Sequence, residues 1–200
     1  MPAANQDPET PSRLIVIRHG ATEWSRAGRH TGHTDLPLTQ SGQEEARLLG
    51  ERLAKFSPVI VFTSPLRRAL DTSRLAGCGD GAIVDDRLVE WDYGEYEGLT
   101  FAQIQEQNPG WKLFDDGAPG GESVAEVGAR ADSFLAMLRS DAKLSGREVV
   151  AFAHGHILRV VAARWLGLPT GNSRYFELDS GGIGVLGRKH GEPTMERWNS

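Results

Sequence analysis

Positions 14–20 read LIVIRHG, and this stretch decides the fold that the sequence predicts. Three of its four apolar residues are β-branched, which is typical of a buried strand. The strand stops at Arg18, His19 and Gly20, so a cation and an imidazole stand together at its carboxyl end. Open α/β sheets bind ligands beside such strand ends. The stretch suggests a phosphate held by Arg18 and attacked by His19, although for the tripeptide alone a structural histidine in a turn is the better interpretation.

Two further apolar runs end in the same way. Positions 59–63 (VIVFT) lead to a polar turn and then to Arg67 and Arg68 at the start of a helix, and positions 149–153 (VVAFA) lead to His154-Gly155-His156. In a doubly wound sheet such strand ends can lie side by side. Alternating strands and helices predict an α/β protein, a three-layer α/β/α sandwich with a mostly parallel central sheet. Two arginines and two histidines at one point would form a pocket for a dianion.

The remaining elements are predicted from capping signals and short apolar runs. A helix is expected to begin after Thr39 or Ser41, with Ser41 and Glu44 as a capping box, and to end before Pro58. Ser123 and Glu126 form a second capping box, before a long helix. Helices are also expected over 100–107 and from 157 to about 167. Further strands are expected at 83–84, 175–178, 183–188 and 195–198, the last three at the edge of the sheet.

Length and composition predict one domain in an ordinary water-soluble chain. We expect a disordered leader at 1–12, a domain at 13–200 and a small lid around 91–122. The formal net charge of −5 suggests neither a nucleic acid nor a membrane surface as partner. No run of residues is long and apolar enough to cross a membrane.

Cysteine usage and the surroundings of the histidines bear on the chemistry. The single cysteine, Cys78, allows no intramolecular disulfide and no zinc cluster, which favours a cytoplasmic protein. Cys78 has no histidine beside it in sequence to activate it as a nucleophile. A metal site is disfavoured because arginines repel a cation and no carboxylate stands at ligand spacing beside either histidine. A serine hydrolase is disfavoured because the chain has no Gly-x-Ser-x-Gly elbow.

A loop rich in carboxylates and aromatic residues runs from 87 to 100 and contains Glu90. Its composition is typical of a segment that covers a site rather than of a solvent face. A carboxyl group held against aromatic rings suits a general acid.

Taken together, these motifs resemble the histidine phosphatase superfamily, also called phosphoglycerate mutase-like. They follow the family order across essentially the whole chain beyond the leader. The matching motifs are Arg18-His19-Gly20-x-Thr22, Thr31-Gly32, Leu36-Pro37-Leu38-Thr39 with Gly42, Thr63-Ser64-Pro65-Leu66-x-Arg68-Ala69, Glu90 with Tyr93-Gly94 and Gly98-Leu99, and His154-Gly155 with Arg159.

The resemblance implies a role for each matching residue. His19 would be the nucleophile that forms a phosphohistidine. Arg18, Arg68 and His154 would hold the phosphoryl oxygens, with Arg67 as a helper. Glu90 would protonate the leaving oxygen and then activate water. The family needs no metal, and we expect no cofactor. The residues expected to bind substrate are Thr22, Ser25, Thr31, Gly32, Tyr93, Gly155 and His156.

Phosphatases and mutases of this family share one site, and several positions favour a phosphatase. Trp91 stands where mutases usually have arginine, and Ser25 and His156 stand where they usually have asparagine. Positions 91–122 contain one cation, Lys112, against seven carboxylates. Such a lid suits a less charged substrate. The segments 90–100 and 152–159 are similar to those of fungal sedoheptulose-bisphosphatases and small actinobacterial acid phosphatases of this family.

The expected function is therefore metal-independent hydrolysis of a small phosphorylated metabolite, a sugar phosphate. The alternative is a cofactor-dependent phosphoglycerate mutase. A non-catalytic module that binds a phosphorylated ligand would predict a broken catalytic set, whereas all five residues of the set are present. A homodimer is left open.

Overall fold

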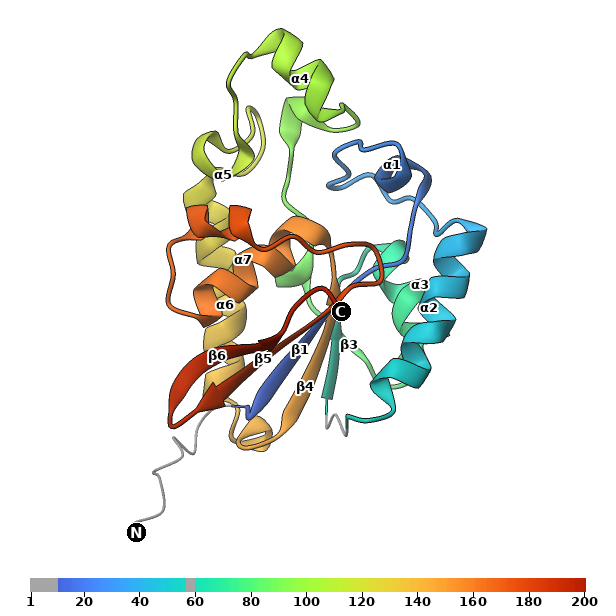
Figure 1. Cartoon of the computed structure of the whole chain (residues 1–200), viewed down its shortest axis with the longest axis vertical. Coiled ribbons are helices and arrows are strands. Elements are labelled where there is room, and N and C mark those ends of the chain that lie inside the picture. Colours follow the sequence, from blue (N-terminus) through green and yellow to red (C-terminus); the bar gives the residue numbers. More distant parts are fainter. Residues whose placement is uncertain (1–10, 57–59) are drawn as a thin grey trace.

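The computed structural model describes residues 11–56 and 60–200, and its centre is a six-stranded sheet (Figure 1). The strand order is β3-β2-β4-β1-β5-β6. The pairs β1–β4, β4–β2 and β2–β3 are parallel, and β5 pairs antiparallel with both β1 and β6. The strands are β1 (Arg13–Arg18), β2 (Ile60–Thr63), β3 (Ile83–Val84), β4 (Glu148–Ala153), β5 (Ile183–Lys189) and β6 (Glu192–Arg197).

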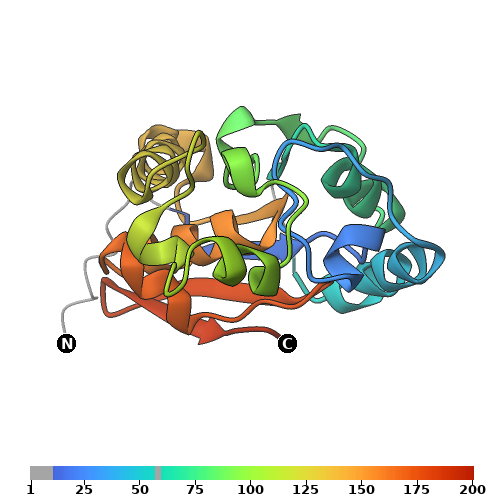
Figure 2. The same ribbon diagram turned by 90° about the horizontal axis from the view of Figure 1, so that it is seen from above.

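Helices cover both faces of the sheet, which confirms the three-layer α/β/α prediction (Figure 2). Leu14 and Val16 of β1 pack in the hydrophobic cluster that α6 and α7 share, while Ile15 and Ile17 pack in a second cluster with α2. Because both faces of β1 are buried, its run of apolar residues is continuous rather than alternating. The α-helices are α1 (Glu23–Arg26), α2 (Gln40–Leu53), α3 (Arg67–Leu75), α4 (Phe101–Gln107), α5 (Leu113–Asp116), α6 (Val124–Ser140) and α7 (Gly155–Trp165).

The capping signals were partly wrong for α2 and correct for α6. Thr39 is the N-cap of α2 and accepts a hydrogen bond from the amide of Gly42 at 3.0 Å. Ser41 therefore lies inside the helix, where it cannot form the expected capping box with Glu44. Ser123 and Glu126 form the expected capping box of α6.

The expected strand at 175–178 is absent, and β5 is not at the edge of the sheet. A 3₁₀ helix covers Thr170–Tyr175, and the following residues have no strand partner because β5 already pairs with β1 and β6. The carbonyl of Leu178 instead accepts a hydrogen bond from Arg18 at 2.6 Å. The edge strand on this side is β6.

The expected leader, the expected second strand and the expected lid are only partly covered by the described residues or lie outside the sheet. Residues 1–10 of the expected leader lie outside the described residues, as does Val59 of the expected second strand. The amide of Ser12 donates to the carbonyl of Arg147 at 2.8 Å. The segment 91–122 carries α4 and α5, which lie beyond the carboxyl ends of β1 and β4 (Figure 1). No helix within the described residues is both long and apolar enough to span a bilayer.

The loop after β1 rests directly on the first turn of α2. A β-carbon at Gly42 would lie 2.2 Å from the carbonyl oxygen of Ala21, and one at Gly20 would lie 2.3 Å from the carbonyl oxygen of Gly42. This close backbone contact fixes the position of His19, which lies between β1 and the contact.

Gly42→Ala is expected to lower the free energy of unfolding by roughly 2 kcal/mol, since overpacking a close contact typically costs 1–3 kcal/mol. In an open helix the same substitution would stabilise by about 1 kcal/mol. The sign of the change, measured by urea unfolding, therefore tests the contact. A stabilised variant would show that the loop does not rest on α2.

Candidate active site

Three strand ends meet where the carboxyl ends of β1, β2 and β4 lie side by side. The amide of His19 donates to the carbonyl of Ala153 at 3.0 Å, and the amide of Ser64 donates to the carbonyl of Phe152 at 2.9 Å. The rings of His19 and His154 are 5.1 Å apart. Parallel strands thus bring together residues that are 135 positions apart in the sequence, from His19 to His154.

His19 is held as a neutral imidazole with one free nitrogen. Its Nδ1 lies 2.7 Å from the carbonyl oxygen of Gly20. A carbonyl only accepts, so Nδ1 carries the proton and Nε2 keeps its lone pair. Burial, followed by the positive charges of Arg68 and Arg18, lowers the pKa of His19 well below its ordinary value of 6.5. The neutral ring therefore keeps a free lone pair on Nε2, as a nucleophile requires.

Arg68 is fully buried and its donors bind the protein itself. Its Nε donates to Nδ1 of His154 at 3.0 Å. Its Nη2 donates to the carbonyls of Thr31 and Gly32, at 3.1 and 2.8 Å. Its Nη1 donates to the carbonyl of Thr34 at 2.9 Å. Arg68 thereby fixes the loop at 31–34 against α3 and places a positive charge beside His19.

His154 takes the opposite tautomer to His19. Because its Nδ1 accepts from Arg68, its proton is on Nε2, which donates to Oγ of Ser64 at 2.8 Å. Burial, then the charge of Arg68, lowers the pKa of His154 well below its ordinary value. His154 is therefore a neutral ring beside His19, and its N–H is already bound to Ser64.

Arg18 is the cation whose donors remain available. Its Nη1 donates to the carbonyl of Leu178, whereas its Nε is buried without a hydrogen-bond partner in the described structure. A β-carbon at Gly155 would lie 3.3 Å from Cζ and Nε of Arg18, so a glycine here lets the guanidinium lie against the start of α7. The guanidinium also lines the cavity, where its positive charge would attract an anion.

Glu90 is positioned by backbone amides. Its Oε1 accepts from the amides of Trp91 and Ile157, both at 2.9 Å, and its Oε2 accepts from the amide of His156 at 3.0 Å. The amides of His156 and Ile157 belong to the first turn of α7. Three donors thus hold the carboxyl group in one orientation beside the pocket.

A second layer, which the sequence interpretation missed, supports Glu90. The guanidinium of Arg130 binds the carboxylate of Glu122 through both Nε and Nη2, at 2.8 and 2.6 Å. Its Nη1 donates to the carbonyl of Val89 at 2.6 Å. No sequence signal marks this pair. The helix that carries Arg130 is predicted from its capping box, which says nothing about the contacts of its polar side chains.

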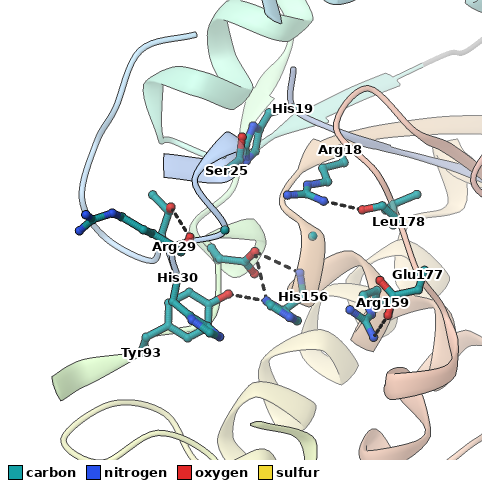
Figure 3. Close-up of a pocket in the computed structure, with 14 residues that line it drawn as sticks. Arg18, His19, Ser25, Arg29, His30, Tyr93, His156, Arg159, Glu177 and Leu178 are labelled. Atoms are coloured by element: carbon teal, nitrogen blue, oxygen red, sulfur yellow. Dashed lines mark hydrogen bonds and ion pairs between the residues drawn. The ribbon is translucent and has the colours of Figure 1, made fainter. Parts of the chain in front are cut away.

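A cavity of about 220 Å³ contains the candidate nucleophile (Figure 3). Of the expected site residues, those that line the cavity are Arg18, His19, Ser25, Thr31, Glu90, Tyr93, Gly155 and His156. The sequence interpretation gave no role to six others that line it, which are Gly28, Arg29, His30, Arg159, Glu177 and Leu178. His30 and Arg29 belong to a polar, glycine-rich loop whose composition was a signal for phosphate binding.

Four expected site residues lie behind the cavity wall. Arg68 and His154 make the contacts described above. Thr22 is buried as the N-cap of α1, in a capping box with Ser25. The amide of Gly32 donates to the carboxylate of Glu97, at 3.0 and 2.8 Å to its two oxygens.

Three further residues bear on alternative chemistries. Arg67 is exposed and pairs with Asp71 at 3.1 Å, away from the cavity. Burial raises the pKa of the Cys78 thiol, which disfavours a thiolate nucleophile. Among the residues described, no group of three His, Cys, Asp or Glu side chains is arranged to hold a metal ion.

The buried histidines should make the fold sensitive to mild acid. The pKa values of His19, His154 and His156 are all lowered well below 6.5 by burial. Below pH 6.5 the unfolded chain binds protons that the folded chain does not, so the free energy of unfolding falls as the pH falls. Each such histidine contributes at most about 1.4 kcal/mol per pH unit.

We therefore expect the midpoint of thermal unfolding to fall steadily from pH 6.5 to pH 5. The slope should be smaller in a His154→Gln variant, which lacks one of the three groups. A midpoint that stays constant across this range would contradict the lowered pKa values.

Comparison with known proteins finds one family and several relatives that match most of the chain. The family model described as histidine phosphatase superfamily (branch 1) matches residues 14–200. An acid phosphatase of Mycobacterium tuberculosis is 44% identical, over 90% of this chain and 88% of that protein. The sedoheptulose 1,7-bisphosphatase of Saccharomyces cerevisiae is 31% identical, over 94% and 93%. The solved structure of a Mycobacterium tuberculosis open reading frame product has a TM-score of 0.88 and 43% identity, over 94% and 96%.

Proposed function

The chain belongs to the histidine phosphatase superfamily, and from this premise we propose that it hydrolyses phosphate monoesters without a metal, through a phosphohistidine on Nε2 of His19. The observation that carries the proposal is the hydrogen bond from Nδ1 of His19 to the carbonyl of Gly20. It leaves the Nε2 lone pair free in a cavity that Arg18 and Glu90 also line. Nucleophile, anion-binding cation and carboxyl group thus share one cavity.

In the first step, Nε2 of His19 attacks phosphorus and the bond from phosphorus to the ester oxygen breaks. The protonated carboxyl group of Glu90 gives its proton to the departing oxygen. The guanidinium of Arg18, which lines the cavity, binds a phosphoryl oxygen. Arg68 adds positive charge from behind His19, and His154 holds its guanidinium there by accepting a hydrogen bond from Nε.

In the second step, the carboxylate of Glu90 takes a proton from water while the water oxygen attacks phosphorus. The bond between phosphorus and Nε2 breaks, and inorganic phosphate leaves with both enzyme groups restored. Because the pKa of His19 is lowered, the nucleophile stays unprotonated below pH 6.5. The proposed enzyme therefore works in mildly acidic solution.

The proposed substrate is a small sugar phosphate. The yeast relative named above is a sedoheptulose bisphosphatase. That relative is named for a sugar with two phosphates, whereas the segment 91–122 of this chain, with one cation against seven carboxylates, disfavours a second phosphate, so the likeness supports the sugar alone. The single thiol, Cys78, is in keeping with a cytoplasmic enzyme.

Phosphate release from a panel of esters tests this proposal. The panel contains sugar phosphates, phosphoglycerates and an aryl phosphate, assayed with and without a chelator at pH 5.5 and 7. We expect release from sugar phosphates that the chelator does not reduce. Interconversion of 2- and 3-phosphoglycerate after priming with bisphosphoglycerate, without phosphate release, would instead identify a mutase.

A further inference from the structure

A second cavity continues from the first on the side away from His19. It measures about 440 Å³ and shares His30, His156, Arg159 and Glu177 with the first cavity. Its other walls come mainly from the segment 91–122, through the aromatic residues Phe101, Trp111 and Phe114 and through Lys112 and Leu113, and Arg174 completes the lining. The part of a substrate beyond the ester oxygen would extend past the two shared histidines.

The proton of His156 is on the nitrogen that does not bind Tyr93. The Tyr93 hydroxyl lies 2.5 Å from Nδ1 of His156 and has no other hydrogen-bond partner among the described residues. Because the hydroxyl has no other acceptor among these residues, we assign its proton to the hydrogen bond with Nδ1. Burial lowers the pKa of His156, which is therefore neutral and carries its proton on Nε2.

His30 is the opposite tautomer to His156. Its Nδ1 lies 3.1 Å from the carbonyl oxygen of Leu99, which can only accept, so Nδ1 carries the proton. Burial lowers the pKa of His30, and the neutral ring offers the lone pair of Nε2. The planes of the two imidazoles lie within 3° of each other with centroids 6.1 Å apart. Figure 3 shows His30 beside the hydrogen-bonded pair of Tyr93 and His156.

A donor and an acceptor side by side suit a hydroxyl-bearing group. A hydroxyl both donates and accepts, whereas a phosphate dianion or a carboxylate only accepts and would face the Nε2 lone pair of His30. Arg159, the cation shared by both cavities, is already paired with Glu177 at 3.3 Å and donates to the carbonyl of Ser173 at 3.1 Å. The pair of histidines therefore favours a neutral hydroxyl over a second anion at its own position. Two further cations, Lys112 and Arg174, line other parts of the cavity, and Arg174 is paired with Asp115.

We propose that His30 and His156 bind neighbouring hydroxyl groups of a polyol on the leaving-group side of the substrate. Nε2–H of His156 donates to one hydroxyl oxygen, and Nε2 of His30 accepts the proton of the same or the adjacent hydroxyl. Tyr93 acts through His156, as the positioning residue that sets its tautomer. The proposal rests on the proposed phosphatase function and specifies its substrate as a polyol phosphate.

A matched pair of substrates isolates the hydroxyl groups. Sorbitol 6-phosphate and n-hexyl phosphate have the same six-carbon chain and differ in the hydroxyls alone. The quantity to measure is the ratio of their kcat/KM values in wild type and in the His156→Phe, His30→Phe and Tyr93→Phe variants. Each variant should reduce the wild-type preference for sorbitol 6-phosphate by about tenfold, the value of one lost hydrogen bond in a site built for it.

His156→Gln provides the conservative comparison, because its side-chain amide keeps a donor, and it should retain more of the preference than His156→Phe. Thermal unfolding of each variant verifies that it folds. A ratio that stays at the wild-type value in both His156→Phe and His30→Phe would overturn the proposal, since a purely structural role changes both substrates equally.

Binding separates this proposal from the phosphatase proposal. In a His19→Ala background, where no phosphohistidine can form, the dissociation constants of the same two esters are measured by calorimetry with and without His156→Phe. A preference for sorbitol 6-phosphate that falls with His156→Phe supports the hydroxyl site even if the wild type releases no phosphate. Equal affinity for the two esters in the His19→Ala background would overturn it.

Discussion

A His19→Ala variant is expected to lose phosphate release by at least about 10⁴-fold in kcat/KM, because removal of a covalent nucleophile leaves only binding and electrostatic stabilisation. The proposed mechanism gives this role to Nε2, whose lone pair is free because Nδ1 donates to Gly20. Steady-state hydrolysis of p-nitrophenyl phosphate measures the loss. Acid quenching after brief exposure to radiolabelled substrate should trap acid-labile phosphate on the wild type and none on the variant.

Two comparisons make this result specific. His33→Ala removes an exposed histidine from the same loop region, outside the candidate cavity, and should retain wild-type turnover. Added imidazole should partly restore turnover in His19→Ala by entering the space that the ring vacates. If His19→Ala keeps both its activity and its labelled phosphate, the nucleophile is another group and the phosphohistidine mechanism is wrong.

The sequence could predict the layers and the place of the site because both follow from strand ends. The apolar runs before Arg18 and before His154 mark two central parallel strands, and adjacent parallel strands bring such ends together whatever lies between them. The expected strand at 175–178 failed because a short apolar run does not reveal whether a partner strand is available. Leu178 uses its carbonyl for Arg18 instead.

The internal geometry of the site could not be predicted in the same way. The sequence placed Arg68 near the substrate, but its full burial and its hydrogen bond to His154 depend on the path of the loop at 31–34. The tautomers of His19 and His156 depend on a local carbonyl and on the Tyr93 hydroxyl. A role for His30 could not be predicted from the sequence. What distinguishes this residue is the parallel position of its ring beside His156, and no spacing in the sequence encodes that contact.

Glu90→Gln is expected to lower kcat/KM for an alkyl phosphate by about 10²–10⁴-fold, the usual contribution of a general acid or base. An alkoxide is a poor leaving group and needs the proton of Glu90, whereas p-nitrophenolate leaves without one. With p-nitrophenyl phosphate, the variant should therefore form the phosphohistidine and then stall, because no carboxylate activates water. Stopped-flow absorbance should show a burst of about one p-nitrophenol per active site, followed by slow turnover.

The hydrogen bonds of Glu90 decide how this experiment must be controlled. Glutamine has the shape of glutamate, but the amide nitrogen that replaces one carboxylate oxygen accepts no hydrogen bond. It therefore cannot replace the carboxylate in binding all three amides, those of Trp91, His156 and Ile157. One donor loses its partner, at a cost of about 1–3 kcal/mol in stability, so unfolding must be measured alongside activity. Glu95→Gln, an exposed position on the same loop, is the matched variant and should behave as wild type. Loss of the burst together with an equal fall for alkyl and aryl esters would mean that Glu90 only positions α7. A preserved burst with slow turnover requires Glu90 in the second step, because the first step has then been completed without it.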